Sequence, residues 1–320
     1  MQTRILGNTG LELTTVGLGT WAIGGGDWKF GWGPQDENDA VNAVVKAVDL
    51  GINWIDTAAV YGDGHSEELV GRALKELGSS RRPLVATKCS RVFQMDGNIK
   101  GDLSRANIMR EVDASLHRLG TDVIDLYQLH WPVPDEDIEE GWTAMADLVR
   151  QGKVRHIGVS NFDVTQMKRA QTIHAIASLQ PPYSMIVRDV EKELLGFCQD
   201  QGIGVITYSP MYKGLLTGAF STERLENLGA GDHRRNDPRF QSPQLERFLA
   251  LVDGLRPIAQ QHGRTLAELA VAWVLRQSAV TSAIVGARRP EQIVVTAPAS
   301  DWQLDAEDIA TIDALLVSLG

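Results

Sequence analysis

The chain has 320 residues, of which 43% are hydrophobic and 22% are charged, a composition typical of a globular protein. Its formal net charge of −10 at pH 7 repels polyanions, which argues against nucleic acid or an anionic membrane surface as the main partner. Cys89 and Cys198 are too few for a disulfide framework and too far apart for a zinc motif, so we expect buried thiols. No apolar run approaches the ~18 residues of a membrane span, which predicts a cytoplasmic protein.

Short apolar runs alternate with helical periodicity along the chain, as in a parallel sheet with crossover helices. The first predicted element is a hairpin, with strands over 3–6 and 12–15 around a Gly-Asn-Thr-Gly turn. Eight strands follow, predicted over residues 14–19, 53–56, 84–88, 125–130, 156–160, 177–180, 204–209 and 282–286. Helices are predicted over residues 37–50, 67–77 (with Ser66 as its N-cap), 105–118, 139–150, 191–201 and 266–276. Eight such units predict an α/β protein with a (β/α)8 TIM barrel.

Residues 211–242, after the seventh strand, form a connection far longer than the usual ~2–6 residues, which indicates a lid or binding loop. No linker or low-complexity segment divides the chain, so one barrel domain is expected over residues 1–320. The stretch 17–22 fits the dinucleotide fingerprint G-x-G-x-x-A. Because the glycines at 24–26 do not favour the helix that must follow, a Rossmann site is disfavoured.

Polar residues end several of the predicted strands. Asp56, Lys88 and His130 end strands two, three and four, and Tyr61 follows Asp56 by five residues. Because active sites of such barrels lie at the carboxyl ends of the strands, we expect the four side chains at one mouth. Each has a structural explanation when taken singly, but together they suit carbonyl reduction. Tyr61 would supply the proton, with its pKa lowered by Lys88; Asp56 would orient Lys88, and His130 would bond the substrate oxygen.

The sequence resembles the aldo-keto reductases, specifically the bacterial inositol-operon-linked and general-stress reductases. The resemblance covers nearly the whole chain and rests on the motifs at 16–20, 55–58, 61–62, 66–67, 86–88, 125–127, 130, 157–162, 208–210 and 214–218. It implies that Tyr61 is the acid and base, that Lys88 and Asp56 tune it, and that His130 orients the carbonyl.

The resemblance also implies an NADP(H) cofactor across the barrel mouth. Ser160, Asn161 and Gln180 match the positions that hold the carboxamide, and Tyr208 matches the aromatic ring that stacks on the nicotinamide. Other expected cofactor contacts are Gly19, Thr20, Trp21, Asp56, Ser209, Pro210, Met211, Lys213, Gly214, Leu215 and Gly286. Arg288 would meet the 2′-phosphate and Gln292 the adenine. Arginines at a helix N-terminus oppose the helix dipole unless an anion is bound there.

Trp21, Trp28, Trp32 and Trp131 stand in loops after the first and fourth strands and suggest an aromatic pocket for sugar-like or aromatic carbonyls, although loop packing explains many of them equally well. The first hypothesis is an NADP(H)-dependent reductase of small aldehydes, ketones or sugar-derived carbonyls.

A second hypothesis is a cofactor-binding redox-sensing subunit like the potassium-channel β subunits. A third is a metal-dependent hydrolase using Asp56, His65 and His130, but the chain lacks a close His-x-His pair, so no metal is expected. The physiological substrate and the oligomeric state stay open.

Overall fold

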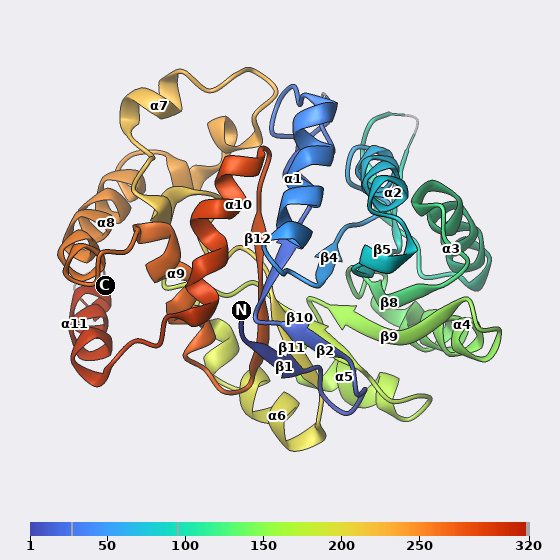
Figure 1. Cartoon of the computed structure of the whole chain (residues 1–320). Helices are drawn as coiled ribbons and strands as arrows, with labels where there is room; N and C mark the ends of the chain where they lie inside the picture. The colour runs from blue at the N-terminus through green and yellow to red at the C-terminus, as the bar shows by residue number, and fades with distance from the viewer. Residues whose placement is uncertain (27, 95, 318–320) are drawn as a thin grey trace.

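The computed structural model describes residues 1–26, 28–94 and 96–317, and its centre is a closed barrel of parallel strands (Figure 1). The strands follow one another around the barrel in chain order, and the last pairs with the first. They are β3 (Val16–Gly19), β4 (Trp54–Asp56), β5 (Leu84–Cys89), β8 (Ile124–Leu129), β9 (Val154–Ser160), β10 (Ser178–Gln180), β11 (Gly204–Thr207) and β12 (Val280–Gly286). The predicted (β/α)8 barrel is therefore confirmed, with some strands a residue or two shorter than expected.

Helices surround the barrel (Figure 1). They are α1 (Glu37–Asp49), α2 (His65–Leu77), α3 (Arg105–Leu119), α4 (Ile138–Arg150), α5 (Val164–Gln171), α6 (Leu194–Gln201), α7 (Thr222–Glu226), α8 (Gln244–Gln261), α9 (Leu266–Leu275), α10 (Pro290–Thr296) and α11 (Ala306–Val317). The sequence patterns give no bounds for α5, α7, α8, α10 or α11. Two of these, α5 and α10, have only eight and seven residues, and α8 contains Pro257, which obscures a helical pattern. No helix among the described residues is long and apolar enough to cross a membrane.

Ser66 is not the N-cap of α2, contrary to the prediction. The helix begins at His65, and Gly64 is its N-cap with a left-handed φ of 94°. The Ser66 hydroxyl instead lies within 3.0 Å of the Thr57 hydroxyl and donates to the Thr20 backbone carbonyl at 3.0 Å. Tertiary contacts to two barrel strands have therefore replaced a local cap.

Two hairpins lie outside the barrel. The predicted N-terminal hairpin is present as β1 (Thr3–Ile5) and β2 (Glu12–Thr14). A second one, β6 (Arg91–Phe93) with β7 (Ile99–Gly101), follows β5 and was not predicted, because strands of three residues carry almost no periodicity.

The N-terminal hairpin supplies part of the core inside the barrel. Leu6 and Leu13 form one buried apolar cluster with residues of five barrel strands: Trp54, Ala86, Leu126, Ile206 and Ile284. The two predicted free thiols are also buried, as expected.

Candidate active site

A polar layer lies directly beyond this apolar cluster. Because side chains of a strand alternate between its two faces, the residue two positions further on faces the same side. Two positions after Trp54, Ala86, Leu126 and Ile206 stand Asp56, Lys88, Gln128 and Tyr208. The apolar cluster thus gives way to charged and amide groups at the carboxyl ends of the strands, where barrels of this class place their sites.

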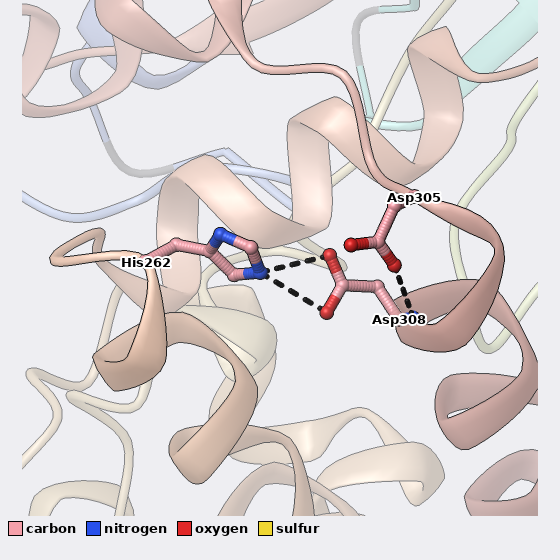
Figure 2. A group of neighbouring side chains, drawn as sticks. All are labelled: His262, Asp305 and Asp308. Carbon is pink, nitrogen blue, oxygen red and sulfur yellow. Dashed lines mark hydrogen bonds and ion pairs between the residues drawn. The ribbon is translucent and has the colours of Figure 1, made fainter.

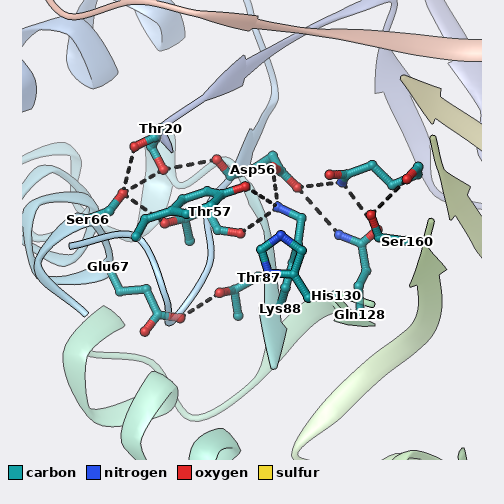
Figure 3. A network of polar contacts seen from close by, with 12 residues as sticks. Thr20, Asp56, Thr57, Ser66, Glu67, Thr87, Lys88, Gln128, His130 and Ser160 are labelled. Atoms are coloured by element: carbon teal, nitrogen blue, oxygen red, sulfur yellow. Dashed lines mark hydrogen bonds and ion pairs between the residues drawn. The ribbon is translucent and has the colours of Figure 1, made fainter. Parts of the chain in front are cut away.

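Lys88 lies at the centre of this layer. Its Nζ donates to Asp56 Oδ1 at 2.6 Å, to the Thr57 backbone carbonyl at 2.9 Å and to Tyr61 Oη at 3.2 Å. The side chains of Lys88 and Asp56 are only 0% and 3% exposed. The structure therefore brings the predicted acid, ammonium and carboxylate into direct contact. Figure 3 shows the contact between Lys88 and Asp56.

His130 completes the group. It follows β8, and its ring meets the Tyr61 ring edge-on with centroids 5.8 Å apart. Burial, with the Lys88 and Arg91 charges nearby, lowers the pKa of His130 well below 6.5, so the imidazole is neutral at pH 7. Its Nδ1 is buried without a hydrogen-bond partner in the described structure. A neutral imidazole carries one N–H and one acceptor nitrogen, so His130 is equipped to bond a carbonyl oxygen.

The electrostatics differ from the expectation in one respect. Burial raises the pKa of Tyr61 above 10.0, and the Lys88 ammonium offsets only part of that increase. The predicted lowering of the Tyr61 pKa by Lys88 is present, but burial outweighs it, because removing the phenolate from water costs more than the ammonium returns. Burial alone would lower the pKa of Lys88, but the neighbouring Asp56 and Tyr61 raise it, so Lys88 is charged.

Hydroxyl and carboxylate contacts hold the segment between β4 and α2 in place. Thr57 and Ser66 bond each other at 3.0 Å, and Ser66 lies 2.8 Å from the Thr20 hydroxyl (Figure 3). Glu67 is fully buried, where it accepts from the Thr87 hydroxyl at 2.6 Å and pairs with an arginine of α3. This network fixes the loop that carries Tyr61 against the strand that carries Lys88.

The predicted carboxamide residues lie next to this tetrad. Ser160 Oγ donates to the Gln180 backbone carbonyl at 2.8 Å, and Asn161 Nδ2 donates to the His130 backbone carbonyl at 3.0 Å. Tyr208 donates to Asn161 Oδ1 at 2.9 Å. The Gln180 amide nitrogen donates to Asp56 Oδ2 at 2.8 Å. The four residues from three strand ends therefore form one polar surface continuous with Asp56.

The predicted pyrophosphate loop has unusual backbone geometry. Ser209, Tyr212 and Lys213 have left-handed φ angles of 58°, 47° and 55°, and Gly214 follows at 91°. Such angles are strained for residues other than glycine and concentrate at functional sites. The same loop includes Pro210, Met211 and the buried Leu215. Next to this loop around the rim, Gly286 of β12 and Gly19 of β3 pair in register, and Gly19 pairs with Asp56. Because glycine has no side chain, neither residue places a side chain over the backbone at this rim.

Cationic side chains gather around this loop although the chain is acidic overall. Lys213 and Arg239 share Asp237 at 3.0 Å and 2.5 Å, and Arg234 pairs with Asp232 at 2.6 Å. Three cations around two carboxylates leave an excess of positive charge. Together with the unpartnered His130 nitrogen, this surface suits a pyrophosphate-containing nicotinamide cofactor.

Arg288 precedes α10, as expected, but its guanidinium is already engaged. It donates to Gln35 Oε1 at 2.8 Å, to the Trp32 backbone carbonyl at 3.0 Å and to the Pro34 backbone carbonyl. Its backbone N–H donates to Gln292 Oε1 at 2.6 Å. A guanidinium has five N–H groups, so two remain for a phosphate while three hold the segment 32–35.

The four predicted pocket tryptophans do not form one wall. Trp21 and Trp32 pack around the His233 ring, with centroids 5.1 and 5.0 Å away. Trp28 packs against Phe30 and Phe93, both at 5.9 Å. Trp131 takes part in none of these ring contacts and is 41% exposed.

Residues 31–32, ahead of α1, meet the long loop that follows β11. Trp32 forms a backbone bridge to Asp232, and the His233 N–H donates to the Gly31 carbonyl at 3.0 Å. Figure 1 shows the connection that carries α7 reaching toward the loop before α1. The segment 211–242 therefore contributes to the mouth, as a lid or binding loop would.

Two groups of residues contain side chains that can bind a metal ion. Asp56 Oδ1 binds the Lys88 ammonium and His65 lies 3.4 Å from Glu68, so the predicted trio with His130 forms no ligand cluster in the described chain. His262, Asp305 and Asp308 do lie together between α8 and α11 (Figure 2). There Asp305 caps α11 by accepting the Asp308 N–H at 2.8 Å, and His262 pairs with Asp308 at 2.9 Å, which accounts for the cluster structurally.

Sequence reasoning missed several residues at the site. Gln128 was overlooked although it stands two positions after a core leucine of its strand, the signal that marks Asp56 and Lys88. Phe93, His233 and Arg234 come from a short hairpin and a long loop whose paths no local pattern reveals.

Comparison with known proteins agrees with this geometry. Residues 15–317 match the aldo/keto reductase family. The chain is 38% identical to aldo-keto reductase YhdN of Bacillus subtilis over 99% of its length and 94% of the relative, and 37% identical to an NADH-specific methylglyoxal reductase of Escherichia coli over 90% of each. The solved structure of the glycerol dehydrogenase AKR11B4 from Gluconobacter oxydans superposes with a TM-score of 0.88 at 38% identity, covering 99% of this chain and 95% of that one. This chain belongs to the aldo/keto reductase family and is an oxidoreductase of carbonyl compounds.

Proposed function

We propose that this protein is an NADP(H)-dependent reductase of aldehydes and ketones, with Tyr61 as the general acid. The observation that carries the proposal is the buried contact of Lys88 Nζ with both Asp56 Oδ1 and Tyr61 Oη, at 2.6 and 3.2 Å. A charged ammonium bonded to a phenol stabilises the phenolate that forms when the phenol gives up its proton.

Each side chain has a distinct role in the proposed reduction. When bound, the nicotinamide cofactor supplies hydride to the carbonyl carbon. Tyr61, protonated at neutral pH because its pKa is raised, donates its phenolic proton to the carbonyl oxygen. Lys88 then stabilises the phenolate, and Asp56 keeps the ammonium charged and in place. His130, as a neutral ring, bonds the carbonyl oxygen and fixes the direction from which it meets Tyr61.

The preference for NADP(H) rests on Arg288, whose two remaining N–H groups suit a 2′-phosphate. The name of the Escherichia coli relative specifies NADH, so the preference is decided by measuring both cofactors with this protein. The names of two relatives refer to methylglyoxal and to glycerol, which are three-carbon compounds, and this supports a small oxygenated substrate. Methylglyoxal reduction and glycerol oxidation are therefore the first reactions to assay.

The test of the acid is Tyr61→Phe, with Tyr127→Phe as a matched control, because Tyr127 is another buried tyrosine whose hydroxyl lies outside the tetrad. Tyr61→Phe should bind NADPH like the wild type but lose at least about a hundredfold in turnover, the usual contribution of a general acid. Tyr127→Phe should keep its turnover. Retained turnover in Tyr61→Phe would refute the assignment.

The alternative, a redox-sensing regulatory subunit, differs from this reading in the expected rate of turnover. Slow turnover across a broad panel of carbonyls, with stoichiometric cofactor retained through purification, would favour the sensor instead.

A further inference from the structure

Gln128 is a buried amide that the proposed mechanism leaves without a role. It lies in β8, paired in register with Lys88 of β5 and with Gly158 of β9. Its side chain is completely buried. A Cβ on Gly158 would come 3.4 Å from Gln128 Cγ and 2.2 Å from Ser178 Oγ, so the missing side chain at Gly158 makes room for this layer. A buried amide of this kind is costly unless its polar atoms are bonded.

The polar atoms of Gln128 are used within the site. Its Nε2 donates to Asp56 Oδ2 at 3.4 Å, and its Oε1 accepts from Gln180 Nε2 at 3.3 Å. Gln180 Nε2 also donates to Asp56 Oδ2 at 2.8 Å. Gln128, Gln180 and Asp56 therefore form a closed triangle of hydrogen bonds.

This triangle permits only one orientation of each amide. An ionised carboxylate only accepts, so both glutamines must present their NH2 groups to Asp56. The second N–H of Gln180 then needs an acceptor, and Gln128 Oε1 supplies it. Turning the Gln180 amide over would place its oxygen against two acceptors, the Asp56 carboxylate and the Gln128 carbonyl, and would break both hydrogen bonds.

The fixed orientation determines what Gln180 offers to a ligand. With Nε2 committed, the remaining polar atom is Oε1, which receives no hydrogen bond from the described residues and can only accept. A group that meets it must be a donor, such as the NH2 of a carboxamide. We propose that Gln128 is a positioning residue that locks the Gln180 amide and thereby selects the nicotinamide carboxamide at Gln180 Oε1.

This inference rests on the proposed function, because it requires a nicotinamide ligand. The inference also extends the proposed function, because Lys88 and Gln180 both donate to the same carboxylate, that of Asp56. Asp56 Oδ1 holds the catalytic ammonium while Asp56 Oδ2 holds both glutamines. Gln128 thus links the position of the proton donor to the position of the nicotinamide ring.

The test compares Gln128→Met with the wild type, because methionine keeps the length of the side chain and removes both polar atoms. Isothermal titration calorimetry measures Kd for NADP⁺ and for adenosine 2′,5′-bisphosphate, which has no nicotinamide, and likewise for NAD⁺ and ADP-ribose. We expect the dinucleotide Kd to rise about tenfold, the equivalent of one lost buried hydrogen bond, while the Kd of the truncated ligand stays within about twofold. Ser178→Ala, a buried change beside the same layer, should alter neither.

Equal weakening of both ligands, or no weakening of either, would overturn the positioning role. If Gln128→Met does not fold, Gln128→Leu provides the same comparison, since leucine also removes both polar atoms from this buried position. Failure of the wild type to bind any of the dinucleotides would overturn the proposed function itself. Normal wild-type binding with an unaffected Gln128→Met variant would overturn only the role of Gln128.

Discussion

The ion pair between Asp56 and Lys88 provides a quantitative test of the site. The two charged atoms are 2.6 Å apart, and the side chains are 3% and 0% exposed. At an effective dielectric constant of ~20, Coulomb's law gives about 6 kcal/mol for such a separation. Desolvation of the two ions offsets much of this energy, but it is not recovered when only one partner is removed. We therefore expect Asp56→Asn or Lys88→Met alone to lower the free energy of unfolding by about 3–5 kcal/mol.

The double variant should behave differently from the sum of the two. Once one charge is gone, removing the other relieves the unpaired ion, so the double variant should lose less stability than either single variant. The measurement is urea denaturation of the cofactor-free wild type, both single variants and the double variant, followed by circular dichroism at one pH. Turnover, assayed alongside, should stay lost in the double variant because the ammonium beside Tyr61 is absent.

The matched control is the surface pair of Lys192 and Asp189, whose charged atoms lie 2.7 Å apart while the side chains are 79% and 82% exposed. Removing either of these should cost far less stability than removing Asp56 or Lys88, because solvent screens an exposed pair. Additive losses at Asp56 and Lys88, or single losses as small as those of the control pair, would refute the view that burial couples the two charges.

Three further outcomes follow from the structure. Because reduction needs protonated Tyr61 and its pKa lies above 10.0, turnover in the reductive direction should stay level from about pH 6 to 9 and fall only in stronger alkali. An inflection near pH 6.5 would show instead that His130 titrates. Arg288→Ala should weaken NADP⁺ binding about 10- to 100-fold in a direct titration, while the exposed Arg289→Ala should not; equal losses would remove the case for Arg288. Burial raises the pKa of Glu111 from 4.5 to about 7, so its contribution to stability is full below pH 4.5 and is lost as the pH rises through 7. The free energy of unfolding of the wild type should fall between about pH 4 and 8, and in Glu111→Gln this fall should be smaller by about 3 kcal/mol. The same fall in both proteins would contradict this prediction.

The barrel and the tetrad could be predicted because both follow from local patterns. Parallel strands separated by helices leave few topologies, and the carboxyl ends of such strands meet at one edge. Asp56, Lys88 and His130 each stand at or next to the end of a predicted strand, so their convergence required no knowledge of side-chain packing. Gln128 was within reach of the same reasoning and was passed over because a strand-interior glutamine attracts less notice than a charge.

Other features required contacts between distant parts of the chain. Ser66 has the residue type of a helix cap, yet its hydroxyl is taken by Thr20, which is 46 residues earlier. Trp32 meets Asp232 across the mouth, and Arg288 holds the carbonyl of the same tryptophan, 256 residues away.

The sequence by itself determined the order of strands and helices and the residue types at the strand ends, because these depend on neighbours within a few positions. Tertiary structure alone decided the direction of the Tyr61 pKa shift, the orientation of the Gln180 amide and the closing of two loops over the mouth. The physical reason is that desolvation and hydrogen-bond competition depend on every group that surrounds an atom. Most of those groups come from distant parts of the chain, and local sequence patterns do not reveal that these parts lie close together.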